Sequence, residues 1–301
     1  MASPRQDAPK SEQDRPPASR HRRAAGTPVA LGGSMEDQEG AAPPAGRGDG
    51  SIGRIFDILD LFSVDLPVLR VEDVLDRLGY TKSTAYRYLR TLCDVGLLAQ
   101  AGDGFYSLGP RVIELDRMLH LTDPLLQAGQ RIMPRLSGAM PNSIVLLSSL
   151  YRDRVLCVHK EGPERILAGG QSIQILRARG LPLPLFRGAA SLVILASLPT
   201  HRIRSLYLLR QAEIVAAGLG TDWREFRGTL ARLRRKGHMT TAGQFNPSLA
   251  AIAVPVLSRD RSQVRGSLTR VMAKDDYTAA NEADLVADLQ AAAAQIAAQL
   301  P

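Results

Sequence analysis

The sequence predicts an α+β protein in two parts, with short helices near the N-terminus and antiparallel strands nearer the C-terminus. Between residues 51 and 95 apolar side chains recur at helical spacing in three short segments separated by glycine or proline. Further along, two pairs of strand-like apolar runs each enclose a polar turn, at residues 143–150 and 154–159 and at residues 249–257 and 264–272. Antiparallel strand pairs together with helices that lie in separate parts of the sequence are typical of an α+β architecture.

Length and composition limit the class of protein. The chain has 301 residues, of which 45% are hydrophobic, so two domains are the working expectation. The longest uncharged apolar stretches are about ten residues, half of what a membrane-spanning helix needs, so no membrane association is expected. Two cysteines allow at most one disulfide, which favours a cytoplasmic location.

Residues 1–50 have a different composition from the remainder. They are rich in Pro, Gly, Ala, Ser and Arg and carry almost no large apolar side chains, so we expect a disordered tail. Residues 20–23 form a small basic cluster, which we interpret as a solvated part of the tail rather than a phosphate contact. Met35, which follows two glycines and a serine, is a hypothetical alternative start of translation.

Residues 51–95 predict three helices joined by tight turns. Pro67 separates the first two helices, and Gly79 is suited to end the second in a left-handed conformation. Thr81 or a neighbouring hydroxyl can cap the third, which runs to about Val95, with Gly96 closing it. The expected apolar stripes are Ile52, Ile55, Phe56, Leu59 and Phe62; then Val71, Val74, Leu75 and Leu78; then Ala85, Tyr88, Leu89, Leu92 and Val95.

The free face of the third helix suggests DNA binding. It carries only cations, a hydroxyl and a phenol, with no acidic residue before Asp94, and its members are Lys82, Ser83, Tyr86, Arg87 and Arg90. Such a face suits the major groove of DNA. A solvated amphipathic helix with a chance run of cations explains the helix alone equally well. Residues 97–100 and 105–108, however, predict a hairpin around a glycine-rich turn, and a hairpin after such helices forms a winged helix-turn-helix over residues 51–109.

Several motifs of this region resemble one family. The segments SIGRIFDILDL (residues 51–61) and TKSTAYRYLRTL (residues 81–92), followed by the Tyr-Ser-Leu-Gly-Pro run at residues 106–110, are similar to the DNA-binding half of the IclR family of bacterial transcriptional regulators. The resemblance implies a repressor or activator that binds a palindromic operator in double-stranded DNA as a homodimer or tetramer. It implies that the DNA-facing residues are Lys82, Ser83, Thr84, Tyr86, Arg87 and Arg90, with Arg54 touching the backbone.

The resemblance extends more weakly over the rest of the chain. We expect linker helices at residues 110–140, the first starting at Pro110 and the second capped by Asp123. The remaining part, residues 141–301, would be a GAF-like effector-binding domain for a small organic acid or an aromatic metabolite. A last helix is expected from about Ala280.

The expected effector pocket maps onto the family pattern in part. Residues 185–199 look like the pocket loop and its following helix, although Ser191 and Leu192 stand where a Gly-Lys pair is common. Backbone N–H groups at the start of this helix suit a carboxylate, and hydroxyls replace the acidic positions of the family. The effector-binding candidates are Arg187 as counter-charge, Ala189, Ala190, Thr240, Ala250, Ser267 and Thr269. Ordinary hydroxyls of a sheet face and an exposed arginine explain these residues equally well.

The sequence shows no residue pattern for a metal site, a cofactor site or an enzyme active site. Cys157 and His159 form one Cys-x-His pair, which is two ligands short of a zinc site, and no phosphate-binding glycine loop or nucleophile elbow occurs. We therefore expect no metal, no cofactor and no enzyme activity. The net charge of +8 gives little support to DNA binding, because residues 51–120 hold eight Lys or Arg against ten Asp or Glu. A small-molecule sensor or protein-interaction module without specific DNA binding is the alternative.

Overall fold

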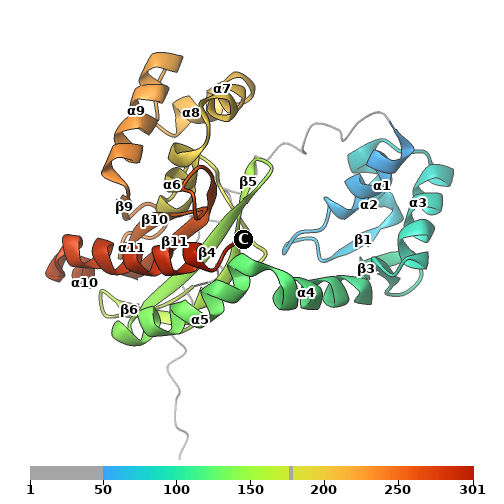
Figure 1. The fold of residues 1–301 in the computed structure, drawn as a ribbon. Coiled ribbons are helices and arrows are strands. Elements are labelled where there is room, and N and C mark those ends of the chain that lie inside the picture. Colours follow the sequence, from blue (N-terminus) through green and yellow to red (C-terminus); the bar gives the residue numbers. More distant parts are fainter. Residues whose placement is uncertain (1–49, 176–178) are drawn as a thin grey trace, which may run out of the picture.

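The computed structural model describes residues 50–175 and 179–301, and it has the α+β architecture that the sequence predicts (Figure 1). The expectations for residues 1–49 lie outside these ranges. The N-terminal part contains α1 (Ser51–Leu59), β1 (Val68–Arg70), α2 (Val71–Leu78), α3 (Lys82–Asp94), β2 (Leu98–Gln100) and β3 (Phe105–Leu108). Its three strands form one antiparallel sheet in the order β1-β3-β2. The three helices and the hairpin of a winged helix-turn-helix are therefore present.

Two of the expected apolar stripes in the N-terminal part include residues that are not buried. Ile58 on α1 is completely buried, whereas Ile52 and Phe56 are exposed, and Phe62 lies beyond the end of the helix. At the end of α3, Val95 is also exposed, because it is the capping residue whose backbone has left the helical conformation. Strand β1 was not predicted, since three residues after a proline are too short to show a period of two.

Helix α4 (Pro110–Thr122) joins the two parts of the chain, and α5 (Pro124–Ala139) follows after Asp123 (Figure 1). Asp123 caps α5 as predicted, because its carboxylate accepts a hydrogen bond from the Leu126 N–H at 2.9 Å. Helix α5 buries its apolar stripe against the sheet of the C-terminal part. In contrast, α4 has no buried residue, so its apolar side chains do not face a core within this chain.

The C-terminal part is built on a six-stranded antiparallel sheet in the order β8-β5-β4-β11-β10-β9. Its strands are β4 (Ser143–Tyr151), β5 (Arg154–Glu161), β8 (Pro182–Leu183), β9 (Met239–Ala242), β10 (Leu249–Leu257) and β11 (Val264–Ala273). The two predicted hairpins are the pairs β4–β5 and β10–β11. A separate hairpin, β6 (Arg165–Ala168) with β7 (Gln171–Gln174), covers one edge of the core.

Helices cover both faces of this sheet. One face packs against α5 and α11 (Glu282–Ala298), with α10 (Lys274–Ala279) beside them. The other face is covered by α6 (Ala189–Ser197), behind which lie α7 (Thr200–Leu209), α8 (Gln211–Ala216) and α9 (Trp223–Lys236) (Figure 1). The predicted last helix corresponds to α11, capped by Asn281. None of the helices in the described ranges is long and apolar enough to span a bilayer.

Candidate functional site

The start of α3 is fixed by a capping network. The Thr81 hydroxyl accepts a hydrogen bond from the Thr84 N–H at 3.4 Å and donates one to the Thr84 hydroxyl at 2.9 Å. Thr84 is therefore half-buried and engaged in the cap. On the opposite side of the helix Ala85, Tyr88 and Leu89 are buried in the N-terminal core. This anchoring sets which side of α3 meets solvent.

The exposed side of α3 presents five of the predicted DNA-facing residues together: Lys82, Ser83, Tyr86, Arg87 and Arg90. Among the residues that the structure describes, no salt bridge involves Lys82, Arg87 or Arg90. The Arg87 guanidinium lies over the ring of Tyr88 at 5.1 Å, which restricts its side chain without neutralising its charge. The face can thus offer three cations and two hydroxyl groups to a polyanion.

Sequence reasoning missed Tyr80, which connects this helix to α1. Its hydroxyl donates to the Arg54 carbonyl oxygen or to a carboxylate oxygen of Asp57, each at 3.1 Å. Burial, with a smaller contribution from Asp57, raises the pKa of Tyr80 to about 12, so the phenol keeps its proton. The side chain of Arg54 is exposed beside this contact. The sequence signal that could have identified this contact was an aromatic residue directly after Gly79, which ends α2.

A further cation, Arg70 on β1, lies beside the wing and was also missed. The turn of the wing contains Gly102 and Gly104, which both adopt positive φ values that favour glycine. Next to the turn of the wing, the Arg70 guanidinium of β1 lies over the Phe105 ring at 5.0 Å. Arg70 was not predicted because strand β1, which pairs it with Phe105, was not recognised.

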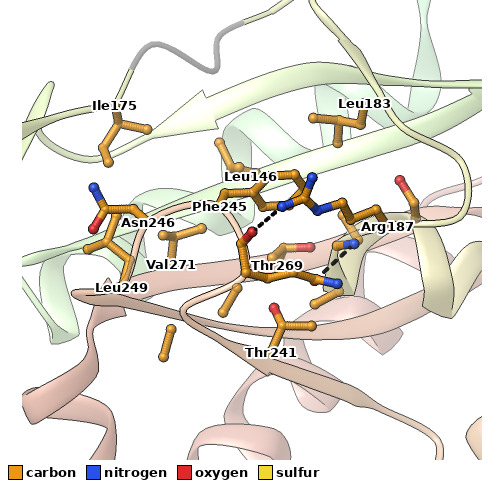
Figure 2. Close-up of a pocket in the computed structure, with 17 residues that line it drawn as sticks. Leu146, Ile175, Leu183, Arg187, Thr241, Phe245, Asn246, Leu249, Thr269 and Val271 are labelled. Carbon is orange, nitrogen blue, oxygen red and sulfur yellow. Dashed lines mark hydrogen bonds between the residues drawn. The ribbon is translucent and has the colours of Figure 1, made fainter. Parts of the chain in front are cut away.

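A cavity of about 60 Å³ lies between α6 and the sheet of the C-terminal part (Figure 2). Five of the predicted effector-binding residues line it: Arg187, Ala189, Ala190, Ala250 and Thr269. Apolar side chains make up most of the remaining wall: Leu146, Ile175, Leu183, Phe245, Leu249, Ala251 and Val271. Thr241, Gln244, Asn246 and Ser191 add polar groups. The site is therefore a mostly apolar pocket with a few convergent polar atoms, as small-molecule sites usually are.

Two predicted residues lie outside the lining. Thr240 neighbours Thr241 on β9, and because side chains alternate along a strand, Thr240 points to the opposite face, where its hydroxyl donates to Glu282 at 3.2 Å. Ser267 shares the face of Thr269 but lies two residues before it on β11, opposite Ser148 on β4. The alternation of side chains along β9 would have placed Thr240 correctly only if it had been known which face of that strand meets the cavity.

The Arg187 side chain is held at the rim of the cavity. Its guanidinium donates to the Gln244 carbonyl oxygen at 2.6 Å and lies over the Phe245 ring at 4.9 Å. In return, the Gln244 side-chain oxygen accepts a hydrogen bond from the Gly188 N–H at 3.1 Å (Figure 2). These contacts fix the cation next to the start of α6.

Helix α6 begins at the cavity wall. Gly188 adopts a φ of +90°, and a Cβ atom at this position would lie 2.8 Å from the Phe245 ring, so only glycine fits. The Leu192 N–H donates to the Gly188 carbonyl oxygen at 3.0 Å. The N–H groups of Ala189, Ala190 and Ser191 therefore precede the first turn and have no acceptor in the helix ladder. All three residues line the cavity, which makes this a suitable end for an anion.

The described residues contain no cluster of three metal-ligating side chains. Cys157 is buried and its thiol is 3.4 Å from the carbonyl oxygen of His159. His159 lies 3.3 Å from a Glu161 carboxylate oxygen, and burial lowers the pKa of its imidazole. The Cys-x-His pair thus has ordinary structural contacts.

One ion pair connects the linker helix to the C-terminal part. The Asp116 carboxylate on α4 accepts hydrogen bonds from Arg179 at 2.7 and 3.0 Å. Arg179 also donates to the Val158 carbonyl oxygen of β5 at 3.0 Å. The pocket residue Leu183 follows four residues later, so a single connecting segment contacts both α4 and the cavity wall.

Family models match both parts of the chain. The model described as IclR helix-turn-helix domain matches residues 51–102, and that described as bacterial transcriptional regulator IclR C-terminal matches residues 119–298. The HTH-type transcriptional regulator KipR of Bacillus subtilis (strain 168) is 24% identical over 69% of this chain and 80% of its own length. The HTH-type transcriptional regulator KdgR of Dickeya chrysanthemi is 25% identical over 83% of this chain and 79% of its own length. Both relatives are named as transcriptional regulators.

Solved structures share the fold. A crystal structure of an IclR transcriptional regulator from Silicibacter sp. TM1040 has a TM-score of 0.68 at 21% identity, covering 83% of this chain and 96% of that one. An IclR homologue from Microbacterium hydrocarbonoxydans, solved in complex with 4-hydroxybenzoate, has a TM-score of 0.58 at 22% identity, covering 83% of this chain and 99% of that one.

Proposed function

Because this chain belongs to the IclR family of DNA-binding transcriptional regulators, with an effector-binding domain after its helix-turn-helix, we propose that α3 contacts a palindromic operator and that a small organic acid controls this binding. The single observation that carries the proposal is the exposed face of α3. Three cations and two hydroxyl groups share this face, and no described acidic side chain neutralises them. The function is thus operator binding regulated by a metabolite.

We assign different roles to the residues at the DNA interface. Lys82, Ser83 and Tyr86 lie in the first turns of α3, the part of a recognition helix that reaches base edges. Arg87 and Arg90 follow on the same face and contact bases or phosphates. Thr84 supports the cap, and Arg54 on α1 contacts the phosphate backbone. Arg70 beside the wing is a further candidate for a phosphate contact.

The linker helix supports a homodimer or a dimer of dimers. Helix α4 buries none of its side chains in this chain, yet five large apolar residues on it are exposed: Ile113, Leu115, Met118, Leu119 and Leu121. A monomeric protein rarely leaves so many large apolar side chains of one helix in water. A second copy packed on α4 would cover it and would give the two-fold symmetry that a palindromic operator requires. We accordingly keep residues 51–109 as the DNA-binding domain, 110–140 as linker and 141–301 as effector-binding domain.

The pocket favours an anion. The free N–H groups at the start of α6 and the nearby Arg187 suit a carboxylate, and the remaining walls are largely apolar. The cavity of about 60 Å³ is less than half of the roughly 150 Å³ that accommodates benzene in a protein core, so a short-chain acid fits more readily than an aromatic one. An aromatic acid such as the 4-hydroxybenzoate bound to the Microbacterium homologue would require the cavity to expand.

The proposal is tested by affinity selection of genomic fragments with the full-length protein. We expect a palindromic site whose affinity falls steeply with salt, because each phosphate contact releases counterions. The double variant Lys82→Ala/Arg87→Ala should lose this binding. The excess of acidic residues in residues 51–120 supports the alternative of a sensor without specific DNA binding. Recovery of no specific site, with or without candidate acids, would favour that alternative.

A further inference from the structure

Exposed arginines gather at one end of the six-stranded sheet. The turn that joins β4 to β5 and the turn that joins β10 to β11 lie at this end, because β4 and β11 are neighbouring antiparallel strands. The Ser149 hydroxyl on β4 donates to the Arg265 carbonyl oxygen at 3.1 Å. Helix α7 lies beside the first turn, since Arg202 donates to the Arg152 carbonyl oxygen at 3.1 Å. The members of this arginine patch are Arg152, Arg154, Arg202, Arg259, Arg261 and Arg265.

The backbone of both turns is unusual for arginine. In residues 50–175 and 179–301, two residues other than glycine adopt a positive φ, and these are Arg152 at +56° and Arg261 at +59°. This left-handed conformation is unfavourable for a long side chain, and Gly, Asn or Asp is the usual residue there. The turn geometry therefore does not explain an arginine at either position. Its presence in two neighbouring turns indicates a role for the charge itself.

The cations of the patch have no carboxylate partner. Within the described part of the chain, none of its arginines takes part in a salt bridge. The two acids of these turns have other contacts, because Asp153 lies 3.7 Å from Arg210 and Asp260 accepts a hydrogen bond from the Ser262 hydroxyl at 2.7 Å. Cations clustered in this way repel one another, so a bound polyanion stabilises the arrangement.

Duplex DNA suits this patch better than an acidic protein. A protein interface has an apolar core, whereas Tyr151 is the one large exposed apolar side chain of the two turns. Interfaces with DNA are polar and strongly positive, and guanidinium groups bind phosphate oxygens through paired hydrogen bonds. The charge of the chain agrees, because residues 51–120 hold eight Lys or Arg against ten Asp or Glu, and residues 121–301 hold 23 against 13.

We propose that the arginine patch binds the phosphate backbone of a second segment of duplex DNA, outside the half-sites that α3 contacts. The inference rests on the proposed operator binding and adds a DNA contact made by the effector-binding domain. Figure 1 shows α3 on the side of the N-terminal part that faces away from β4 and β5, so the two cationic surfaces are separate. Contacts to phosphate alone add affinity and salt dependence without sequence preference.

The first experiment measures binding of a random-sequence duplex across a salt series. The background is full-length Lys82→Ala/Arg87→Ala, in which the α3 face is weakened, and the test variant adds Arg152→Asn/Arg261→Asn. Asparagine adopts the left-handed backbone more readily than arginine, so Tm should stay the same or rise. The slope of log Kd against log salt concentration should fall by about two, one for each lost phosphate contact.

The matched control in the same background is Arg227→Ala/Arg235→Ala. Both arginines are exposed on α9, and the control removes the same net charge as the test variant. We expect the control to leave the slope nearly unchanged. A second patch variant, Arg154→Gln/Arg259→Gln, alters residues that lack a positive φ and should reproduce the loss. Equal losses in control and patch variants would overturn the proposal, because bulk charge would then explain the effect.

The other outcomes separate the patch from operator binding. A salt slope that both patch variants leave unchanged would overturn the patch as a DNA contact, while a palindromic site recovered with wild type would still support the operator function. Patch-dependent duplex binding without any recovered operator would count against the operator function alone. Poly-glutamate serves as the acidic-protein probe in competition with the duplex. Preferential binding of poly-glutamate, lost in the same variants, would assign the patch to an acidic protein and overturn the proposal.

Discussion

The exposed face of α3 and the pocket beneath α6 are built in opposite ways. The α3 face comes from one helix of 13 consecutive residues, and its side chains are solvated. The pocket draws on strands β4, β8, β9, β10 and β11, on the start of α6 and on the segments joining them, and three of its polar side chains, Ser191, Asn246 and Thr269, are buried. Changes on the α3 face should therefore affect binding alone, whereas changes at the pocket should affect folding as well.

The largest effect on stability is expected at the start of α6. Gly188→Ala would add a Cβ atom 2.8 Å from the Phe245 ring at a φ of +90°, so we expect a loss of about 2 to 3 kcal/mol in the free energy of unfolding. Urea unfolding of the full-length protein measures it. Gly228→Ala on α9 is the control, because its Cβ would meet only the Arg232 side-chain end at 3.9 Å. Equal effects of the two substitutions would contradict the packing argument.

The corresponding change on the α3 face is Arg87→Ala. We expect specific operator binding to weaken by about 1 to 3 kcal/mol if Arg87 contacts a base, and by less, equally for all sequences, if it contacts phosphate. Titration of the selected operator and of an unrelated duplex distinguishes the two. The free energy of unfolding should fall by no more than about 1 kcal/mol, since the side chain is exposed and loses only its contact with the Tyr88 ring. Unchanged binding to both duplexes would remove Arg87 from the interface.

A smaller effect on stability is expected at the N-terminus of α3, the helix that carries the exposed cations. Thr81→Ala removes the side-chain cap of α3 and should lower the free energy of unfolding by about 1 kcal/mol. Thr81→Asn, which can accept the same hydrogen bond, should restore most of the loss. If alanine and asparagine give the same stability, the capping hydrogen bond does not contribute.

The difference between the two regions also explains what could be predicted from the sequence. The exposed residues of α3 could be predicted from helical periodicity alone, because the apolar side of a helix faces the core and leaves the opposite side in solvent. In the pocket, Arg187, Ala189 and Ala190 were identified from one contiguous motif. Leu146 was not, because it reaches the cavity through the pairing of β4 with β11, more than 100 residues away. Phe245 and Ile175 were not either, because they lie in loops outside that motif. Thr240 was misplaced by the orientation of one strand.

The weakest effect concerns pH and the side of the sheet away from the pocket. Hydrogen bonds from Tyr277 at 2.6 Å and from His238 and Lys236 hold the pKa of Glu282 at about 2, below its ordinary value of 4.5. A lowered carboxyl pKa stabilises the fold above pH 4.5, and this contribution disappears as the pH falls from about 4.5 to 2. Glu282→Gln should flatten the stability profile in that window, measured as Tm against pH. An unchanged profile would exclude Glu282 as its origin.

The central claim is that one chain couples the two regions, so that occupation of the pocket changes operator affinity. The most direct test is the Kd of full-length protein for its selected operator, with and without a saturating amount of an acid that raises its Tm. We predict a shift of about 5- to 150-fold in either direction, the usual size of allosteric coupling. An acid that binds the pocket and leaves the operator Kd unchanged would contradict the claim.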